Sequence, residues 1–210
     1  MAYRPTEKTQ ARKAEVRQRL VDAALTMVST GGFGALTIAG VAAQAGIATG
    51  AVYKHFESKA QLCAEVFRIA TEKEVAVVRD TAQGAGSASE RLQHAVAAFA
   101  ERALRNPRLA FALIAEPVDA LVDEQRLRYR QAYAEVFVGL VEQGMRAGEF
   151  AEQVPSVSAA ALVGVIAESL TGPLSPQHGQ DPLAGGPLIA AIQAFCLRAV
   201  AQPTSSRATD

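Results

Sequence analysis

Histidine and cysteine are scarce in this chain, and their scarcity excludes whole classes of site. The three histidines, His55, His94 and His178, form no His-x-x-x-His pair, so neither a metal site nor a cofactor is expected. We interpret His94 as an exposed or hydrogen-bonded helix residue rather than a ligand. The two cysteines, Cys63 and Cys196, frame no disulfide scaffold and indicate buried thiols in a reducing cytoplasm.

Enzyme signatures and targeting signals are also missing. The sequence has no Gly-x-Gly-x-x-Gly after a strand pattern, no P-loop and no Gly-x-Ser-x-Gly, so an enzyme is not expected. Its first residues, MAYRPTEKTQARK, are polar and lack the apolar core of a signal peptide. The longest uncharged apolar candidate, residues 157–166, is too short to span a membrane. We therefore expect a cytoplasmic protein without a membrane partner.

Neither sign of charge is in excess, because 21 Lys and Arg residues balance 21 Asp and Glu residues. This balance hides an asymmetry: residues 1–60 hold eight basic and four acidic side chains, a net charge of +4, and the remainder carries −4. A basic N-terminal portion is typical of a domain that binds a polyanion, although an ordinary fluctuation of composition would look the same. Half of the chain is apolar, which indicates a folded core.

A compact motif occupies residues 36–62, LTIAGVAAQAGIATGAVYKHFESKAQL. Apolar residues recur at helical spacing before Gly46, which can end a helix with φ > 0 at little steric cost. Thr49 is expected to cap a second helix, in which Val52 and Phe56 lie four residues apart and point inward. The pattern predicts two short helices joined by a tight turn, with a third helix directly after them.

The outward face of the second short helix suits a DNA groove. With its two apolar residues turned inward, small, basic and aromatic residues remain outside: Thr49, Gly50, Ala51, Tyr53, Lys54 and His55. Small residues let the backbone approach DNA, while Tyr, Lys and His can donate to phosphates. Lys59 stands in the first turn of the helix that Ser58 caps, where a cation opposes the helix dipole unless a phosphate is near.

This stretch resembles the DNA-binding domain of the TetR family of transcriptional regulators. The matching pieces are Leu36-Thr37-Ile38, Ala42, Ala45-Gly46-Ile47, Gly50, Val52-Tyr53-Lys54-His55-Phe56 and Ser58-Lys59. The match covers about residues 12–67, and beyond it only the chain length and the helical pattern agree. Ala48 departs from the family, which often has Ser there. Whether Thr49 supplies the missing phosphate contact stays open.

The resemblance implies a set of DNA contacts within and beside the motif. These are Thr37, which also caps the first short helix, and Ala48, Thr49, Gly50, Tyr53, Lys54, His55 and Lys59. Tyr53 and Lys59 are assigned to phosphates. Thr49, Gly50 and Lys54 are assigned to bases, because a recognition helix usually reads with its N-terminal part. Two such helices related by a dyad imply a roughly palindromic operator in double-stranded DNA.

The predicted fold is all-helical, with an arm and helix-turn-helix domain over residues 1–57 and a larger ligand-binding and dimerisation domain over residues 58–210. Residues 1–10 are interpreted as a basic arm that reaches DNA or as a solvated tail. A brace helix is expected over residues 11–29. A long helix over residues 58–80 corresponds to the one that transmits ligand binding in the TetR family.

The last two predicted helices are candidates for a homodimer interface. Residues 157–170 are apolar nearly all round, so a second subunit is expected to cover one side of that helix. Together with residues 187–201, it would form a four-helix bundle across two subunits, as TetR-like proteins do. Residues 171–186, rich in Pro and Gly, are expected to form the intervening loop.

Aromatic residues at helical spacing predict a small-molecule pocket in the larger domain. The candidate ligand-binding residues are Phe99, Phe111, Glu116, Tyr129, Tyr133, Phe137 and Glu168. Buried Tyr hydroxyls need partners, and buried carboxylates are costly unless paired. A mostly apolar effector with a hydrogen-bonding or cationic group is therefore expected. The alternative, that the aromatic residues simply fill the core, stays open.

The sequence thus predicts a ligand-responsive, DNA-binding regulator, a repressor that a small molecule releases from its operator. The alternatives are an activator, or a helical homodimeric interaction protein without small-molecule induction. An interaction protein that had lost DNA binding would lack the outward Tyr53, Lys54, His55 and Lys59, all of which are present.

Overall fold

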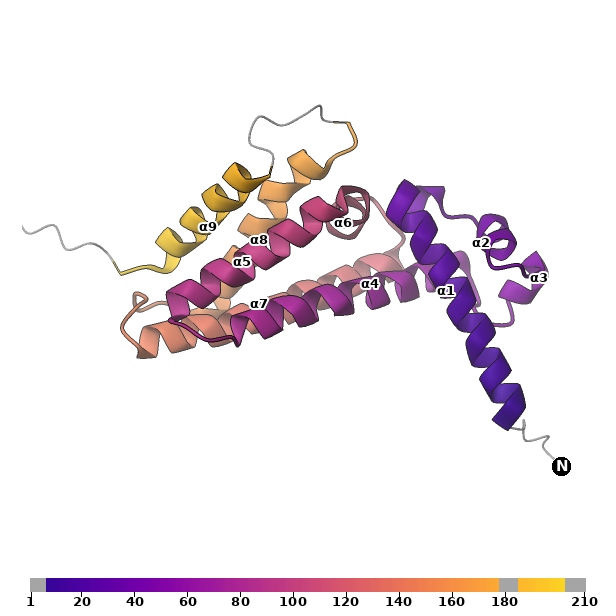
Figure 1. The fold of residues 1–210 in the computed structure, drawn as a ribbon, viewed down its shortest axis with the longest axis horizontal. Helices are drawn as coiled ribbons and strands as arrows, with labels where there is room; N and C mark the ends of the chain where they lie inside the picture. Colours follow the sequence, from indigo (N-terminus) through magenta and orange to yellow (C-terminus); the bar gives the residue numbers. More distant parts are fainter. Residues whose placement is uncertain (1–6, 178–184, 203–210) are drawn as a thin grey trace, which may run out of the picture.

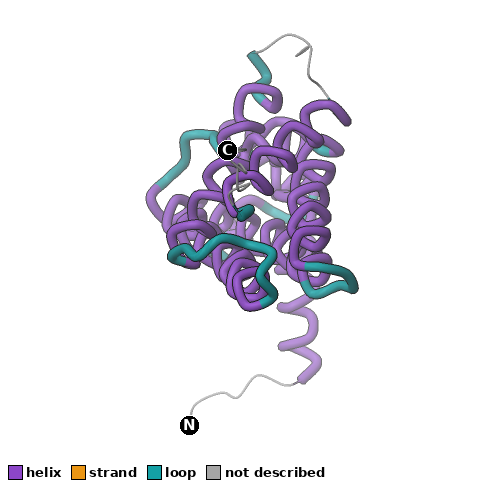
Figure 2. The backbone as a smooth tube through the Cα atoms, turned by 90° about the vertical axis from the view of Figure 1, so that its left-hand side faces the viewer, coloured by secondary structure: helices purple, strands orange, loops and turns teal. Residues whose placement is uncertain are grey.

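The computed structural model describes residues 7–177 and 185–202, and over these residues the chain is helical, without a β-strand (Figure 2). The helices run in this order: α1 Glu7–Ala35, α2 Ile38–Gln44, α3 Thr49–Val52, α4 Lys59–Ala82, α5 Ala88–Arg105, α6 Pro107–Ile114, α7 Ala120–Arg146, α8 Pro155–Leu174 and α9 Gly186–Val200. The predicted all-helical fold is confirmed.

Polar side chains cap the starts of several of these helices, and one of them, Ser58, caps its helix as predicted. Ser58 accepts a hydrogen bond from the backbone N–H of Gln61 and caps α4. Ser87 caps α5 in a capping box, because its hydroxyl accepts from the N–H of Glu90 while the Glu90 carboxylate accepts from the N–H of Ser87. Asn106 caps α6, with Pro107 in its first turn.

The first helix is longer than the expected span of residues 11–29. It begins at Glu7, so residues 7–10 are helical rather than part of an arm; Glu7 lies in the first turn, where a carboxylate complements the helix dipole. Its regular geometry breaks at Gly32, with φ 76° and ψ −178°, and helical turns resume as far as Ala35. Arg4 of the expected arm lies outside the described residues.

The eighth helix also extends past its expected end at residue 170. Pro173 lies in its last turn, where it removes only one backbone hydrogen bond. Leu170 and Leu174 are both buried on the core side, and this burial holds the final turn in place. The loop expected from residue 171 therefore begins after Leu174. His178 lies outside the described residues.

The helices form a small N-terminal unit and a longer bundle beside it (Figure 1). In that view α1, α2 and α3 lie at one end, and α4 and α7 run alongside each other away from them. The α6 helix lies between the end of α5 and the C-terminal end of α1. Both α4 and α6 therefore connect the N-terminal unit to the bundle.

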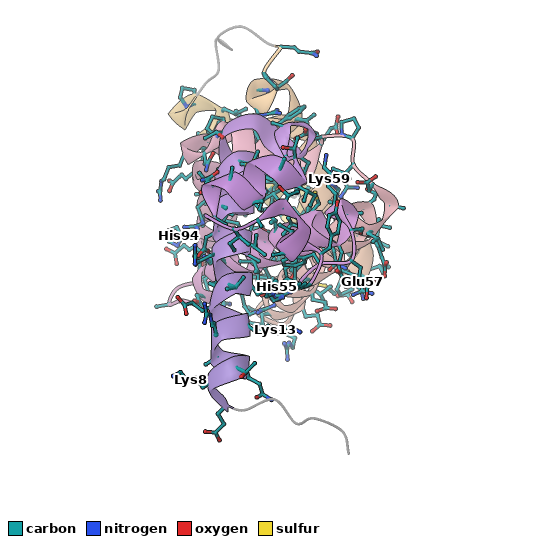
Figure 3. All side chains as sticks on the ribbon, turned by 90° about the vertical axis from the view of Figure 1, so that its right-hand side faces the viewer. Lys8, Lys13, His55, Glu57, Lys59 and His94 are labelled. Atoms are coloured by element: carbon teal, nitrogen blue, oxygen red, sulfur yellow. The ribbon has the colours of Figure 1, made fainter. Side chains whose placement is uncertain are left out.

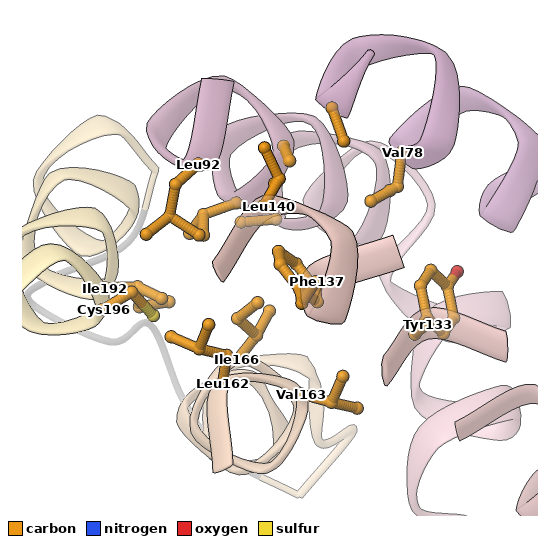
Figure 4. Packing of buried hydrophobic residues seen from close by; sticks show 14 of the residues in the cluster. Val78, Leu92, Tyr133, Phe137, Leu140, Leu162, Val163, Ile166, Ile192 and Cys196 are labelled. Atoms are coloured by element: carbon orange, nitrogen blue, oxygen red, sulfur yellow. The ribbon is translucent and has the colours of Figure 1, made fainter. Parts of the chain in front are cut away.

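Two apolar clusters match these two parts of the molecule. The N-terminal cluster includes Leu20, Val52 and Phe56, and it also takes in Leu62 and Phe67 from the first turns of α4. The larger cluster fills the bundle between α4, α5, α7, α8 and α9. Figure 4 shows its centre, where Phe137 lies among the buried side chains of α5, α7 and α8.

The α8 helix is unusually apolar for a helix that contributes to a protein core. Its 20 residues are long enough and apolar enough to cross a membrane, by length and composition alone. Residues 157–166 alone are too short to span a membrane, but the helix that contains them runs from Pro155 to Leu174. Leu162 and Ile166 face the bundle and are buried, so this side of α8 packs in the protein core.

Candidate functional site: the DNA-binding face and the effector cavity

The turn between α2 and α3 is fixed by short-range contacts and one contact from α1. The N–H of Gly40 donates to the Thr37 hydroxyl at 3.1 Å, so Thr37 caps α2 as predicted. Gly46 follows α2 with φ 65°, a conformation that L side chains rarely adopt. Arg19 on α1 donates to the carbonyl of Ala45 at the end of α2. The first helix therefore braces the turn, as expected.

The α3 helix is short, and its cap differs from the prediction. Its N-cap is Ala48, with no side-chain hydrogen bond, so Thr49 is the first helical residue rather than the cap. The backbone of Ala48 already takes the extended conformation of an N-cap, with φ −65° and ψ 137°. Hydrogen-bonded turns continue beyond the helix to Phe56, and both Val52 and Phe56 are buried, as predicted.

Most of the predicted DNA contacts share one property, which is exposure to solvent. The exposed ones are Thr37, Ala48, Thr49, Gly50, Tyr53, Lys54 and Lys59. A Cβ added at Gly50 would meet no atom within 4 Å, so DNA can approach this backbone closely. Within the described residues no carboxylate pairs with Lys54 or Lys59. Tyr53, 55% exposed, adds an aromatic hydroxyl to this face.

His55 is less exposed than the prediction implied. It lies in the same region as Lys59 and Lys13 (Figure 3), but it is half-buried, and its Nδ1 atom is buried without a hydrogen-bond partner. Burial lowers the pKa of the His55 imidazole, and the positive charges of Lys13, Arg17 and Lys54 lower it further. His55 is therefore neutral at physiological pH in the free protein.

The basic residues of α1 fall into two groups, those that pack within the protein and those that are exposed, and composition alone does not distinguish them. Arg17 stacks over the Phe56 ring, 4.9 Å from its centroid, and pairs with Glu65 on α4 at 2.7 Å. These contacts join α1 to α4 and to the segment between α3 and α4, and they make Arg17 a structural residue. Lys8, Arg12 and Lys13, by contrast, are exposed on the first turns of α1, so a helix and not an arm presents them.

A cavity of about 100 Å³ lies between α4, α5, α6, α7 and α8. Most of its wall is apolar, and three of the predicted aromatic residues, Phe99, Tyr129 and Tyr133, line it. The rings of Phe99 and Tyr133 are 4.9 Å apart between centroids and tilted by 54°. An apolar cavity of this scale can hold a body the size of a small aromatic ring.

Four predicted ligand-binding residues lie away from the cavity. Phe137 is fully buried in the bundle core (Figure 4), and Phe111 packs against the same core. Glu168 is exposed on α8, while Glu116 is buried at the contact of α6 with α1. The structure therefore does not place these four on the cavity wall, because helical spacing shows that a residue is inward without showing which neighbour it meets.

Polar groups that the sequence analysis missed complete the cavity wall. Thr71 and Glu74 come from α4, Arg102 from α5, and Arg126 and Arg130 from α7. Arg102 and Glu74 pair, with Nη2 and Oε1 2.9 Å apart. Alternating charge along a helix is typical of a solvated face, so no signal in the sequence separates Arg126 and Arg130 from the other charged residues of α7.

The chain matches family models over both of its parts. The model described as "Bacterial regulatory proteins, tetR family" matches residues 20–66. A second model, described as "Tetracyclin repressor-like, C-terminal domain", matches residues 85–171. The chain belongs to the TetR family of transcriptional regulators. Members of this family are transcription factors, and this TetR-family protein is a ligand-responsive, DNA-binding regulator.

Curated relatives and solved structures agree with this membership. The chain is 27% identical to the transcriptional repressor KstR2 of Rhodococcus jostii over 146 residues, which cover 68% of this chain and 71% of KstR2. It is 32% identical to the repressor KstR of Mycolicibacterium smegmatis over 99 residues, 47% of this chain and 48% of KstR. FadR of Bacillus subtilis, solved with stearoyl-CoA, superposes with a TM-score of 0.73 at 18% identity over 87% of this chain and 98% of its own. This last likeness shows a shared fold.

Glu116 joins the cavity-lining α6 of this TetR-family protein to its DNA-binding part. Its carboxylate accepts from the backbone N–H groups of Phe33 and Gly34, at 3.1 and 3.0 Å. Arg108, at the other end of α6, lies 3.6 Å from this carboxylate and donates to the carbonyl of Gly31. A Cβ at Gly32 would lie 2.2 Å from Arg108 and 2.3 Å from Glu116, so both side chains close over a glycine. We call these contacts the α1–α6 latch.

The predicted dimerisation helices each leave an apolar stripe in solvent. On α8 the exposed stripe holds Val157, Ala160, Ala161 and Gly164, and on α9 it holds Ala190, Ala191 and Phe195. Val157 is 65% and Phe195 is 51% exposed, high values for large apolar side chains. The residues between them are small and would let another helix approach closely.

Among the described residues, no group of three or more His, Cys, Asp or Glu side chains could hold a metal ion. Cys63 and Cys196 are free and buried, as the sequence predicted. Burial raises the pKa of each thiol to about 11. His94 is exposed on α5, away from the cavity lining.

Proposed function

We propose that this TetR-family protein is a cytoplasmic, homodimeric repressor, which binds a roughly palindromic operator and leaves it when an apolar small molecule enters the cavity. The observation that carries the proposal is the exposed set of Tyr53, Lys54 and Lys59 beside the open backbone of Gly50. Cations and hydroxyls without protein partners at a helix-turn-helix are suited to phosphate oxygens and base edges.

Within this face, the contacts divide by position. We assign base readout to Thr49, Gly50 and Lys54, and phosphate contacts to Tyr53 and Lys59. Thr49 is the first residue of α3 and does not cap it, so its hydroxyl is free for DNA. This arrangement supports Thr49 as the replacement for the hydroxyl absent at position 48.

Lys59 offers the sharpest test of the DNA-binding face, because its side chain lies at the start of α4 and is unpaired within the described residues. Lys59→Ala should weaken binding to the DNA upstream of the protein's own coding region. It should also lower the slope of log affinity against log salt by roughly one, as the loss of one phosphate contact does. Lys73→Ala is the matched control, since Lys73 is also an exposed lysine of α4, about four turns further along.

Fluorescence anisotropy across a salt series measures both quantities for each variant. An unchanged affinity and salt slope for Lys59→Ala would remove Lys59 from the interface. An equal loss in Lys73→Ala would show a general effect of charge rather than a contact. Failure of the wild type to bind any upstream fragment above the level of unrelated DNA would contradict the repressor proposal itself.

The dimer is proposed to form through α8 and α9, over residues 157–170 and 187–201. The exposed apolar stripes of both helices support this interface, because burying them in a second subunit is favourable. Gly164→Arg tests it: no atom of the chain lies within 4 Å of a Cβ there, so a single subunit can hold the new side chain. The variant should sediment as a folded monomer, while Ala76→Arg, at an exposed position on α4, should not change the oligomeric state.

We propose that the chain divides into two functional parts. Residues 1–57 bind DNA, and residues 58–210 bind the ligand and form the dimer. Two elements cross this division. The α4 helix carries Lys59 at the DNA-binding face and Thr71 at the cavity. The α6 helix carries Leu113 at the cavity and Glu116 just beyond its end, in the α1–α6 latch. A ligand that moves either helix would therefore move the DNA-binding part, with a coupling of about 1–3 kcal/mol.

A further inference from the structure

One hydroxyl group of the cavity wall is buried without a hydrogen-bond partner within the described residues. Thr71 is 4% exposed, and its Oγ1 atom is buried without a partner. This is unusual for a helical threonine, since Thr81 and Thr171 both donate to the carbonyl four residues earlier. Tyr133, 8% exposed, projects its ring into the same cavity, and burial raises the pKa of its hydroxyl. An unpaired buried hydroxyl is costly, so the Thr71 hydroxyl is suited to a ligand atom, and Tyr133 brings a second hydroxyl to the wall of the same cavity.

The charges on the cavity wall are not balanced. Glu74 is the one carboxylate of the lining, and Arg102 neutralises it. Arg126 is held by other groups, because it donates to the backbone carbonyls of Leu113 and Glu116 and pairs with Asp123 at 3.0 Å. Arg130 lines the cavity and reaches solvent, and no carboxylate pairs with it in the described residues. The wall therefore has an uncompensated cation at its solvent side.

We propose that the effector is a small apolar acid, whose anionic group pairs with Arg130 and whose body lies against Phe99 and Tyr133. A hydrogen-bonding atom further along the body would meet the hydroxyls of Thr71 and Tyr133. This inference rests on the proposed function, since it names the ligand class of the same cavity. The sequence predicts a hydrogen-bonding or a cationic group on the effector. The cationic alternative loses its basis, because Glu116 and Glu168, the carboxylates that would pair with it, do not line the cavity.

The test compares three head groups on the same apolar bodies. Phenyl, naphthyl and octyl bodies, each as carboxylic acid, alcohol and amine, are titrated into the full-length protein by isothermal titration calorimetry. For at least one body the acid should bind about tenfold more tightly than the alcohol, and the amine more weakly than both. Binding of no acid, or equal binding of acid and alcohol for every body, overturns the proposal.

Arg130→Gln should remove the preference for the acid while leaving the affinity for the alcohol unchanged. Arg128→Gln is the matched control, because Arg128 is exposed on the same helix but pairs with Glu124 and does not line the cavity. It should keep the preference. A preference that survives in Arg130→Gln, or disappears equally in Arg128→Gln, contradicts the assignment. Thr71→Val should weaken binding only of bodies that carry a second polar atom.

Operator binding distinguishes this inference from the proposed function. If the acid binds as expected but does not release the operator, the ligand class assigned to the cavity is right, and the proposed release of the operator through this cavity is wrong. If the alcohol or the amine binds best and releases the operator, the proposed function stands and the anionic ligand class is wrong. The same anisotropy assay, with and without each compound, gives both results.

Discussion

Replacing Glu116 by Gln should loosen the α1–α6 latch without changing the size of the side chain. The carboxylate accepts two backbone hydrogen bonds, from Phe33 and Gly34, and is 9% exposed. A glutamine has one acceptor oxygen, so its NH₂ group would face one of the two N–H donors. One charge-assisted hydrogen bond is lost and a buried donor is left unpaired, which costs about 2–4 kcal/mol of unfolding free energy.

Glu149 provides a matched control at the opposite end of the bundle. Its carboxylate also accepts from two consecutive backbone N–H groups, those of Ala88 and Ser89, at 3.0 and 2.9 Å. These hydrogen bonds lower the pKa of the Glu149 carboxyl. Glu149→Gln removes the same kind of contact, but it touches neither α1 nor α6. It separates a general loss of stability from a loss of coupling between the cavity and the DNA-binding part.

Hydrogen exchange followed by mass spectrometry measures the protection of the backbone N–H groups that the α1–α6 latch holds. In Glu116→Gln the segment containing Phe33 and Gly34 should exchange faster, and in Glu149→Gln the segment containing Ala88 should do so. Only Glu116→Gln should bring the operator affinities with and without ligand closer together. Unchanged exchange around Phe33, together with a stability within about 0.5 kcal/mol of the wild type, would refute the reasoning.

Three further predictions follow from single sites. Gly144→Ala should lower the unfolding free energy, measured by urea denaturation, by about 1–3 kcal/mol, because the new Cβ would lie 2.1 Å from the Phe150 ring. Gly139→Ala on the same helix is the control: its Cβ would meet nothing nearer than 4.0 Å, so the unfolding free energy should not fall. Cys63 and Cys196 should resist Ellman's reagent at pH 7.5 until urea is added, because burial raises both thiol pKa values to about 11. Because the pKa of His55 is lowered on folding, stability should fall as the pH drops below the unfolded value near 6.5, and His55→Asn should lessen this fall in thermal melts.

Much of the DNA-binding part was predictable because its signals act over three or four residues. Thr37 caps α2 through a hydrogen bond to Gly40, and Ser58 caps α4 through one to Gln61. Each needs only its own neighbours in the chain. Thr49 shows the limit of such reasoning. Its side chain is well suited to an N-cap, but the N-cap of α3 is Ala48, whose backbone is extended, and Thr49 is the first helical residue.

The cavity was only partly predictable, for a geometric reason. Spacing along a helix separates an inward from an outward face, and three of the residues it selects, Phe99, Tyr129 and Tyr133, line the cavity. It assigned Phe137 to the same cavity, although that ring points into the bundle core. In a bundle several neighbours surround each helix, so two inward residues can meet different partners.

The sequence by itself determined the helices, their caps and the face that the helix-turn-helix presents, because these depend on contacts within one or two turns. Only the tertiary structure decided which charges are paired and which are free. Glu116 meets the backbone of residues more than 80 positions earlier, and Arg130 is left unpaired while Arg126, one turn away, is held by α6. Such partners are brought together by the packing of helices that are distant in the chain, and no local pattern records that packing.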